Sequence, residues 1–332
     1  MRSGEAEPAE TAGEAVLRHQ RKAIEKIVNF GEYLVAIPEA QLDTWSKQGS
    51  VTQSKATHES IRAVLDSPYS PYAARDCISF LQGSYGNDTN IVGRESDVDI
   101  VLRSNATFFY ENLQLDPNDR VRFDNDLNPA SYDFPTFKTD VFRWLYSKYG
   151  DKVEYGNKAL RISGDGNRRD ADVVPCFQYR KYVRYNEGTS DDYIEGICFI
   201  AEDGTRIVNY PRLHSAHSTW KHQNTGTYYK PMVRILKNMR NKLVDGGALE
   251  KGLAPSYFFE GLLYNAPHEL FGRSYGETFV ATINWLDHAN KSGFLCVNDQ
   301  YHLLHPTDPV TWRAENCEKF IRATILLWNS WK

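Results

Sequence analysis

Residues 80–102 read FLQGSYGNDTNIVGRESDVDIVL, and this stretch decides the fold. An apolar run at 78–81 ends at a glycine-serine pair, and a polar loop then leads to a second apolar run that ends at residue 102. Turn-forming residues between two short apolar runs are typical of a strand, a turn, a loop and a second strand. The sequence therefore predicts a sheet in the first part of the chain, with a polar loop at the end of its first strand.

Two aspartates, Asp97 and Asp99, stand at the head of the second predicted strand. Because side chains alternate between the two faces of a strand, both carboxylates point the same way while Val98 turns into the core. Two carboxylates held side by side repel each other unless a cation lies between them. Oxygen ligands at this spacing suit Mg²⁺, which completes its shell with water and substrate phosphates. The pair therefore predicts a magnesium site.

The turn before the acids, Gln82-Gly83-Ser84, is suited to phosphate binding. A glycine lets backbone amides approach a phosphate closely, and the serine adds a hydroxyl. An Asp-x-Asp pattern alone is also common on exposed loops and at strand starts, so the turn at this spacing is what favours a nucleoside triphosphate site. Gln82, Gly83 and Ser84 are therefore candidate nucleotide-binding residues.

Gly83-Ser84, Thr89 and Ser96-Asp97-Val98-Asp99 together resemble the signature of the DNA polymerase β-like nucleotidyltransferases. Within that superfamily the pattern most resembles the cGAS/DncV-like family of bacterial cyclic-oligonucleotide synthases. The resemblance implies an α+β fold with a sheet-based catalytic lobe, a helical C-terminal lobe and an active site in the cleft between them.

The resemblance also implies a third carboxylate on a later strand, and Asp172 in the stretch RDADVVP at 169–175 matches it. Asp170 lies on the same strand face and is interpreted as the surface ion-pair partner of Arg168 or Arg169. Three carboxylates can hold two Mg²⁺ ions, for which Mn²⁺ can substitute. One ion steadies the triphosphate, and the other lowers the pKa of the attacking hydroxyl.

Further nucleotide contacts are expected in the helical lobe. The pattern at 229–243 predicts an amphipathic helix that carries Lys230, Arg234 and Lys237 on one face. Three cations on one face can hold a triphosphate, although the same pattern fits a solvated surface. The resemblance implies that Lys237 and Ser256 contact the donor triphosphate and that Tyr257 stacks on a base, and Arg234 joins them as a weaker candidate. Separately, the alternation of basic and aromatic residues after Asp172 suggests walls of the base pocket at Tyr179, Tyr182 and Tyr185.

The expected organisation has three parts: a disordered N-terminus at 1–12, a catalytic lobe at 13–210 and a helical lobe at 211–332. Within the catalytic lobe we expect a long loop or insertion, because 104–134 is polar and rich in Asn, Asp and Pro. The remaining patterns predict helices at 14–37, 54–65 and 137–149, strands at 152–162, 169–175 and 178–185, and a hairpin of 196–200 with 205–210.

Composition limits the partners. The chain has 332 residues, a net charge of -4 and a pI near 6.2, so long nucleic acids are not attracted by overall charge and stable DNA binding is not expected. His214, His217 and His222 match no zinc motif. Five widely spaced cysteines favour a reducing compartment, and no apolar run approaches the roughly 20 residues that span a bilayer. We therefore expect a cytoplasmic protein without zinc.

The function that the resemblance implies is a Mg²⁺-dependent synthase that joins NTPs into a cyclic di- or trinucleotide second messenger and releases pyrophosphate. ATP and GTP are the expected substrates, with a pyrimidine NTP as an alternative. The family also implies bacterial anti-phage (CBASS) signalling, an effector that recognises the product, and regulatory partner proteins. Two other functions remain open at this point: a terminal nucleotidyltransferase that acts on RNA, and a non-catalytic nucleotide-binding module of the kind found in antitoxins.

Overall fold

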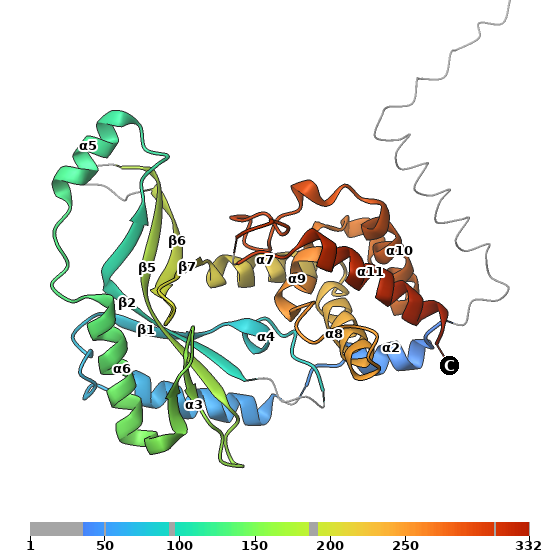
Figure 1. Ribbon diagram of the computed structural model, residues 1–332, viewed down its shortest axis with the longest axis horizontal. Coiled ribbons are helices and arrows are strands. Elements are labelled where there is room, and N and C mark those ends of the chain that lie inside the picture. The colour runs from blue at the N-terminus through green and yellow to red at the C-terminus, as the bar shows by residue number, and fades with distance from the viewer. Residues whose placement is uncertain (1–35, 50, 93–96, 186–191, 309, 332) are drawn as a thin grey trace, which may run out of the picture.

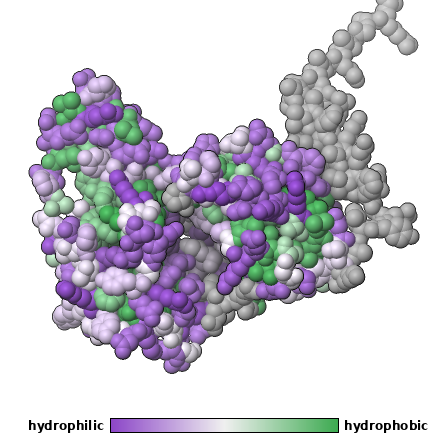
Figure 2. Space-filling view, viewed as in Figure 1, coloured by the Kyte–Doolittle hydropathy of each residue, from purple (hydrophilic) through white to green (hydrophobic). Residues whose placement is uncertain are grey.

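A computed structural model describes residues 36–331, except for 50, 93–96, 186–191 and 309. The predicted disordered stretch at 1–12 and all but the last two residues of the helix predicted at 14–37 lie outside the described residues. The described chain has a sheet part at one end and a helical part at the other (Figure 1). Figure 2 shows that the surface is hollowed between the two parts.

The sheet part is built on seven strands. At its centre β2 and β5 are parallel neighbours, and the remaining pairings, including β6 with β5, are antiparallel. The strand order is β1-β2-β5-β4-β3, with β6 paired to β5 and β7 to β6. The strands are β1 (Cys77–Leu81), β2 (Val98–Glu111), β3 (Val153–Tyr155), β4 (Leu160–Ile162), β5 (Ala171–Arg184), β6 (Asp192–Ile200) and β7 (Arg206–Asn209).

Two helices, α3 (Thr52–Leu65) and α6 (Phe134–Tyr149), pack against the sheet (Figure 1). Residues four apart lie on one side of a helix, and α6 accordingly buries Phe137, Val141 and Leu145 completely in the core of the sheet part. Both helices confirm the predictions from sequence periodicity, to within three residues at their N-terminal ends.

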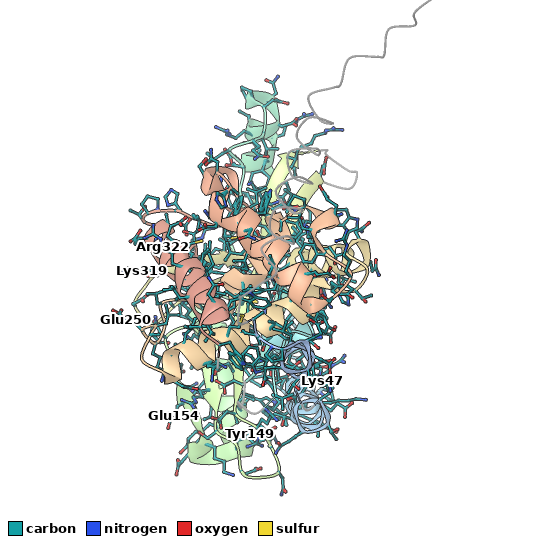
Figure 3. The ribbon with its side chains drawn as sticks, turned by 90° about the vertical axis from the view of Figure 1, so that its right-hand side faces the viewer. Lys47, Tyr149, Glu154, Glu250, Lys319 and Arg322 are labelled. Carbon is teal, nitrogen blue, oxygen red and sulfur yellow. The ribbon has the colours of Figure 1, made fainter. Side chains whose placement is uncertain are left out.

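The helical part begins with α7 at Pro211. Its central helix, α8, buries a continuous apolar stripe that includes Met232, Leu236 and Met239. Aromatic pairs hold the outer helices, among them Phe279 with Trp328 at 4.3 Å between ring centroids, whereas Lys319 and Arg322 project from the outer face of α11 (Figure 3). The helices are α2 (Glu39–Ser46), which packs on α8, then α7 (Pro211–Asn224), α8 (Tyr229–Asp245), α9 (Ser256–Asn265), α10 (Tyr275–His288) and α11 (Ala314–Asn329).

Three sequence predictions within the sheet part were wrong. The stretch 104–134 is not a loop: β2 continues through it to Glu111, and α5 (Pro117–Asp126) follows with the carboxylate of Asp116 capping its first amides. The strands predicted at 169–175 and 178–185 are one strand, β5. The strand predicted at 152–162 is a hairpin of β3 and β4. Pairing with β2, β4 and β6 carries β5 through as one long strand, with register shifts near Ser104 of β2 and near Tyr182 of β5.

Candidate active site

The three predicted acids lie together at the start of β2 and β5. Asp99 and Asp172 face each other in the parallel register of these strands, and Asp97 immediately precedes β2. Burial, followed by the charges of Asp172 and Asp97, raises the pKa of Asp99 to about 7. Burial and the charge of Asp97 also raise the pKa of Asp172. The carboxylates therefore repel one another, and Asp99 and Asp172 are each harder to ionise than an isolated carboxyl group.

This mutual repulsion is what a bound divalent cation would relieve, so the donor set fits the expected magnesium ions. Over the residues that the structure describes, no three His, Cys, Asp or Glu side chains are already arranged to hold a metal ion by themselves. An ion at these acids would therefore take some of its oxygen ligands from substrate phosphates and water, which is usual for Mg²⁺.

The glycine-serine turn packs directly against the acids. Gln82 donates its amide hydrogen to the carbonyl of Asp99 at 3.0 Å, which ties the end of β1 to the start of β2. Gly83 has φ +69°, and a Cβ on it would lie 2.1 Å from Asp99 Oδ2. Only glycine combines this conformation with this approach. The short helix α4 (Gly83–Gly86) then presents Ser84 beside Asp99.

A cavity of about 550 Å³ lies between the sheet part and the helical part, a size that suits a small ligand. Six of the predicted site residues line it: Gly83, Ser84 and Asp99 from the sheet part, Lys237 from α8, and Ser256 and Tyr257 from α9. Gln82, Asp97, Asp172 and Arg234 do not line it. The ring of Tyr257 packs against His214, with ring centroids 5.1 Å apart.

Lys237 belongs to a buried network beneath this cavity. Its Nζ donates to the carbonyl oxygen of Thr89 at 2.9 Å and to Thr89 Oγ1 at 3.0 Å. Thr89 in turn donates to Glu260 Oε1 at 2.6 Å, and the other oxygen of Glu260 accepts from Asn87 at 3.1 Å and is bonded to His214. These hydrogen bonds and the nearby charges of His214 and Lys237 lower the pKa of Glu260 to about 2 despite its complete burial.

The structure corrects the role expected of Arg234. Its half-buried guanidinium donates to the backbone carbonyls of Ser46 and Asp88, while Lys230 pairs with the Asp88 carboxylate at 2.9 Å. These two cations therefore tie α8 to the end of α2 and to the loop after α4. Of the three cations on the predicted face, Lys237 alone lines the cavity.

Two further expectations were wrong. Asp170 pairs with Arg161 at 3.0 Å, because the start of β5 faces β4 and not the arginines that precede it in sequence. Tyr182 and Tyr185 do not form walls of the cavity, since both pack around Phe123 of α5 at the far end of β5. Tyr179, the third tyrosine of that set, packs against Tyr210.

The three histidines at 214–222, which match no zinc motif, make separate contacts. His214 is bonded to Glu260, and His217 is bonded to the carbonyl of Val297 and lies 3.2 Å from an oxygen of Asp299. Burial, together with the charges of Lys230 and Arg234, lowers the pKa of His222 to about 4.

The sequence analysis missed several residues of the site. Arg240 lines the cavity and donates to Ser256 Oγ at 3.3 Å and to the carbonyl of Ala254 at 2.7 Å. Its position three residues after Lys237, on the same side of the helix, was the available signal. For Glu260 the signal was one charged residue in the apolar run FFEGLL. Other lining residues that were not predicted are Asn87, Asn90, Asn241 and Lys251.

Comparison with known proteins shows where this chain belongs. Over 297 residues it is 43% identical to the cyclic UMP-AMP synthase of Rhodothermus marinus, and the match covers 89% of this chain and 99% of that relative. The chain belongs to the cGAS/DncV-like nucleotidyltransferase family. The model of that family's C-terminal helical domain matches residues 216–329. A second relative, the cyclic nucleotide synthase CdnE01 of Staphylococcus haemolyticus, is 38% identical over 90% of this chain and 100% of its own length.

Solved structures of the cGAS/DncV-like family agree with this assignment. The R. marinus CdnE c-UMP-AMP synthase with Apcpp and Upnpp superposes with a TM-score of 0.80 at 42% identity, over 89% of this chain and 97% of that one. The Elizabethkingia meningoseptica CdnE cyclic dinucleotide synthase with GTP and Apcpp superposes with a TM-score of 0.70 at 30% identity, over 86% and 97%. The predicted α+β fold and nucleotidyltransferase class are therefore confirmed. None of the described helices is both long and apolar enough to cross a bilayer.

Proposed function

We propose that this nucleotidyltransferase condenses NTPs into a cyclic di- or trinucleotide and releases pyrophosphate at each bond. The observation that carries the proposal is the pairing of Asp99 with Asp172 beside a cavity that also holds the Gly83-Ser84 turn and Lys237. The R. marinus relative, a cyclic UMP-AMP synthase, supports substrates that include one purine and one pyrimidine NTP. Other relatives are named dipurine and dipyrimidine synthases, so relatives of this chain differ in the bases that they join.

In the proposed reaction, Asp97, Asp99 and Asp172 would hold two Mg²⁺ ions. Bound there, such ions neutralise phosphate charge and make an acceptor hydroxyl more acidic, and Mn²⁺ can substitute. The hydroxyl of the acceptor nucleotide attacks the α-phosphate of the donor, and pyrophosphate leaves. Further attacks of the same kind, one for a dinucleotide and two for a trinucleotide, close the ring, and each releases one pyrophosphate. No side chain becomes covalently modified, so the protein contributes positioning and charge neutralisation.

Different cavity residues contact the triphosphate and the base of the donor nucleotide. Ser84 and the backbone amides of its turn receive phosphate oxygens, and the Lys237 ammonium and Ser256 hydroxyl contact the triphosphate from the helical part. Tyr257 stacks on a base. Arg240, which already holds the Ser256 hydroxyl, adds a second cation on the same side of the cavity. Donor NTPs therefore bind between the two parts of the chain and contact both.

The setting that we propose is bacterial anti-phage signalling in the cytoplasm, where a separate effector binds the product and partner proteins regulate synthesis. Free thiols support a reducing compartment: the five cysteines are unpaired, and four of them, all but Cys77, are buried.

Pyrophosphate release from a mixture of the four NTPs with Mg²⁺ tests this function. The wild-type protein should release pyrophosphate without added RNA, whereas the double variant Asp97→Ala, Asp99→Ala should release none. An RNA terminal transferase would release pyrophosphate only when an RNA primer is added. A non-catalytic module would bind NTPs and release none with either Mg²⁺ or Mn²⁺. Either of these two results would overturn the proposal.

A further inference from the structure

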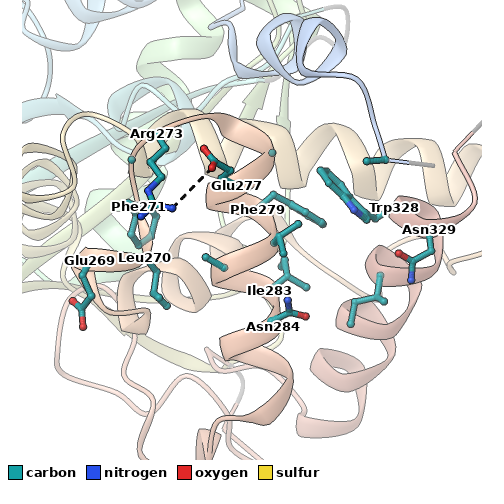
Figure 4. A pocket seen from close by; sticks show the side chains of 16 residues that line it. Glu269, Leu270, Phe271, Arg273, Glu277, Phe279, Ile283, Asn284, Trp328 and Asn329 are labelled. Atoms are coloured by element: carbon teal, nitrogen blue, oxygen red, sulfur yellow. Dashed lines mark ion pairs between the residues drawn. The ribbon is translucent and has the colours of Figure 1, made fainter. Parts of the chain in front are cut away.

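A second cavity, of about 540 Å³, lies in the helical part, and none of its described lining residues also lines the candidate active site. Its wall is mainly apolar and is formed by α10, α11 and the short helix η2 (His268–Leu270). Figure 4 shows Phe279, Ile283 and Trp328 directed toward this space, with Glu269, Arg273 and Glu277 at its edge. We call this cavity the α10–α11 groove. Apolar side chains also gather on the surface of the helical part in Figure 2.

Apolar grooves at a protein surface mark sites where a ligand or another segment of protein binds. The place where the described chain begins points to the segment that could occupy the groove. Ala36, the first described residue, is itself part of the groove wall. Ile37 is buried, and the carboxylate of Glu39 accepts the amide hydrogens of Tyr275 and Gly276 at 2.7 and 2.9 Å. The start of α10 therefore holds this segment in place, and the described chain begins at the groove.

The sequence before Ala36 has the pattern that the groove requires. Residues 14–35 carry Leu17, Ile24, Val28 and Val35 at spacings of seven, four and seven, which places them on one side of a helix, and Ile27 and Leu34 adjoin them. A helix of these 22 residues would be about 33 Å long. The stretch 18–26 carries four basic residues and one acid, which complements the net negative groove edge of Glu269, Glu277 and Arg273, where Glu277 is paired with Arg273 and Glu269 is not.

We propose that residues 14–35 form an amphipathic helix whose apolar side occupies the α10–α11 groove of the same chain. Attachment at Ala36 makes the contact intramolecular. A short tether gives an effective concentration in the millimolar range, which favours this occupant over a second copy of the chain at ordinary protein concentrations. The inference does not depend on the proposed reaction.

Hydrogen exchange of the full-length protein at low micromolar concentration tests the proposal. Amides of 14–35 should exchange at least about tenfold more slowly than in an unstructured peptide. A chain that begins at residue 34 should show faster exchange at 279–284 in α10. Exchange of 14–35 at the unstructured rate would overturn the proposal. Protection that appears only together with a dimer in light scattering would also overturn it, because the segment would then occupy the groove of a second copy.

Matched variants keep the test independent of folding. Val28→Asp, on the apolar side of the segment, should abolish the protection of 14–35, whereas Asn29→Asp on its polar side should preserve it. On the groove, Ile325→Glu should act like Val28→Asp. The control Leu326→Glu, at a 67% exposed position outside the groove, should leave the protection unchanged. Equal effects of the two members of either pair would overturn the proposal.

Discussion

Glu260 is the one acidic side chain in the buried network described above, which also contains Lys237, Thr89, Asn87 and His214. Replacing Glu260 by Gln removes this negative charge. The Glu260 carboxylate is 3% exposed. Its pKa is lowered from 4.5 to about 2, which corresponds to about 3 kcal/mol in favour of the ionised form at roughly 1.36 kcal/mol per unit. Removing one partner from a buried charged network costs about 3–5 kcal/mol. We therefore expect Glu260→Gln to lower the free energy of unfolding by about 3 kcal/mol near pH 7.

Urea unfolding measures this loss, and Glu250→Gln is the control. Glu250 is exposed in the loop after α8 and is labelled at the edge of the molecule in Figure 3. An exposed substitution of this kind changes stability by less than about 0.5 kcal/mol. Glu260→Gln should also raise the KM for NTPs, because Lys237 and Thr89 lose the carboxylate that positions them. If the two variants unfold at the same urea concentration, the network does not stabilise the protein and the reasoning is refuted.

The stability difference between the wild type and Glu260→Gln should depend on pH. A carboxyl group whose folded pKa lies below its unfolded value stabilises the fold at pH above the unfolded value, and this contribution disappears as pH falls through the folded value. The unfolded and folded values for Glu260 are 4.5 and about 2. The stability difference between the wild type and Glu260→Gln should therefore be complete at pH 7 and should narrow below about pH 4.5. A difference that widened with acidification would contradict this account.

Three other substitutions test the candidate active site. Gly83→Ala should abolish pyrophosphate release, because the new Cβ would collide with the Asp99 carboxylate. Gly247→Ala is the control, since Gly247 also has a positive φ, +70°, but no atom lies within 4 Å of the position of its Cβ. This control should lose only about 1 kcal/mol of stability through backbone strain and should keep its activity. Asp172→Asn should reduce turnover at least about a thousandfold, because it removes a ligand for the metal ions. The melting temperature should stay unchanged or rise, since the substitution relieves repulsion among the acids. Near-normal product formation would show that Asp172 is not part of the site. Ser84→Ala should weaken NTP binding about tenfold in calorimetry through the loss of one hydrogen bond to a charged group, and unchanged affinity would count against its role.

Local sequence was sufficient for the features that depend on neighbouring residues. The turn at Gly83 and the alternation of Asp97 and Asp99 follow from chemistry within 20 residues, and the structure has both as predicted. Asp172 is more than 70 positions away, and only the pairing of β2 with β5 places it opposite Asp99. The family resemblance supplied this residue, which spacing alone could not.

The residues that were misplaced or missed depend on contacts between segments far apart in the sequence. Helical periodicity correctly placed Arg234 on the same side of α8 as Lys237, but periodicity does not show which neighbour packs there. The loop at Asp88 and the end of α2 cover Arg234, whereas the cavity opens at Lys237. Glu260 was missed because its importance comes from burial and from partners more than 170 positions away in sequence. Long-range packing of this kind is not visible in a local pattern.

Mass spectrometry of the reaction products tests the central claim most directly. The purified protein is incubated with the four NTPs and Mg²⁺, remaining nucleotides are digested with phosphatase, and the surviving species are weighed. Phosphatase removes terminal phosphates but cannot attack a closed ring. The account predicts a resistant cyclic di- or trinucleotide mass that is absent with Asp97→Ala, Asp99→Ala. Only linear products, from which the phosphatase removes the terminal phosphates, or a cyclic mass that persists in the double variant, would contradict it.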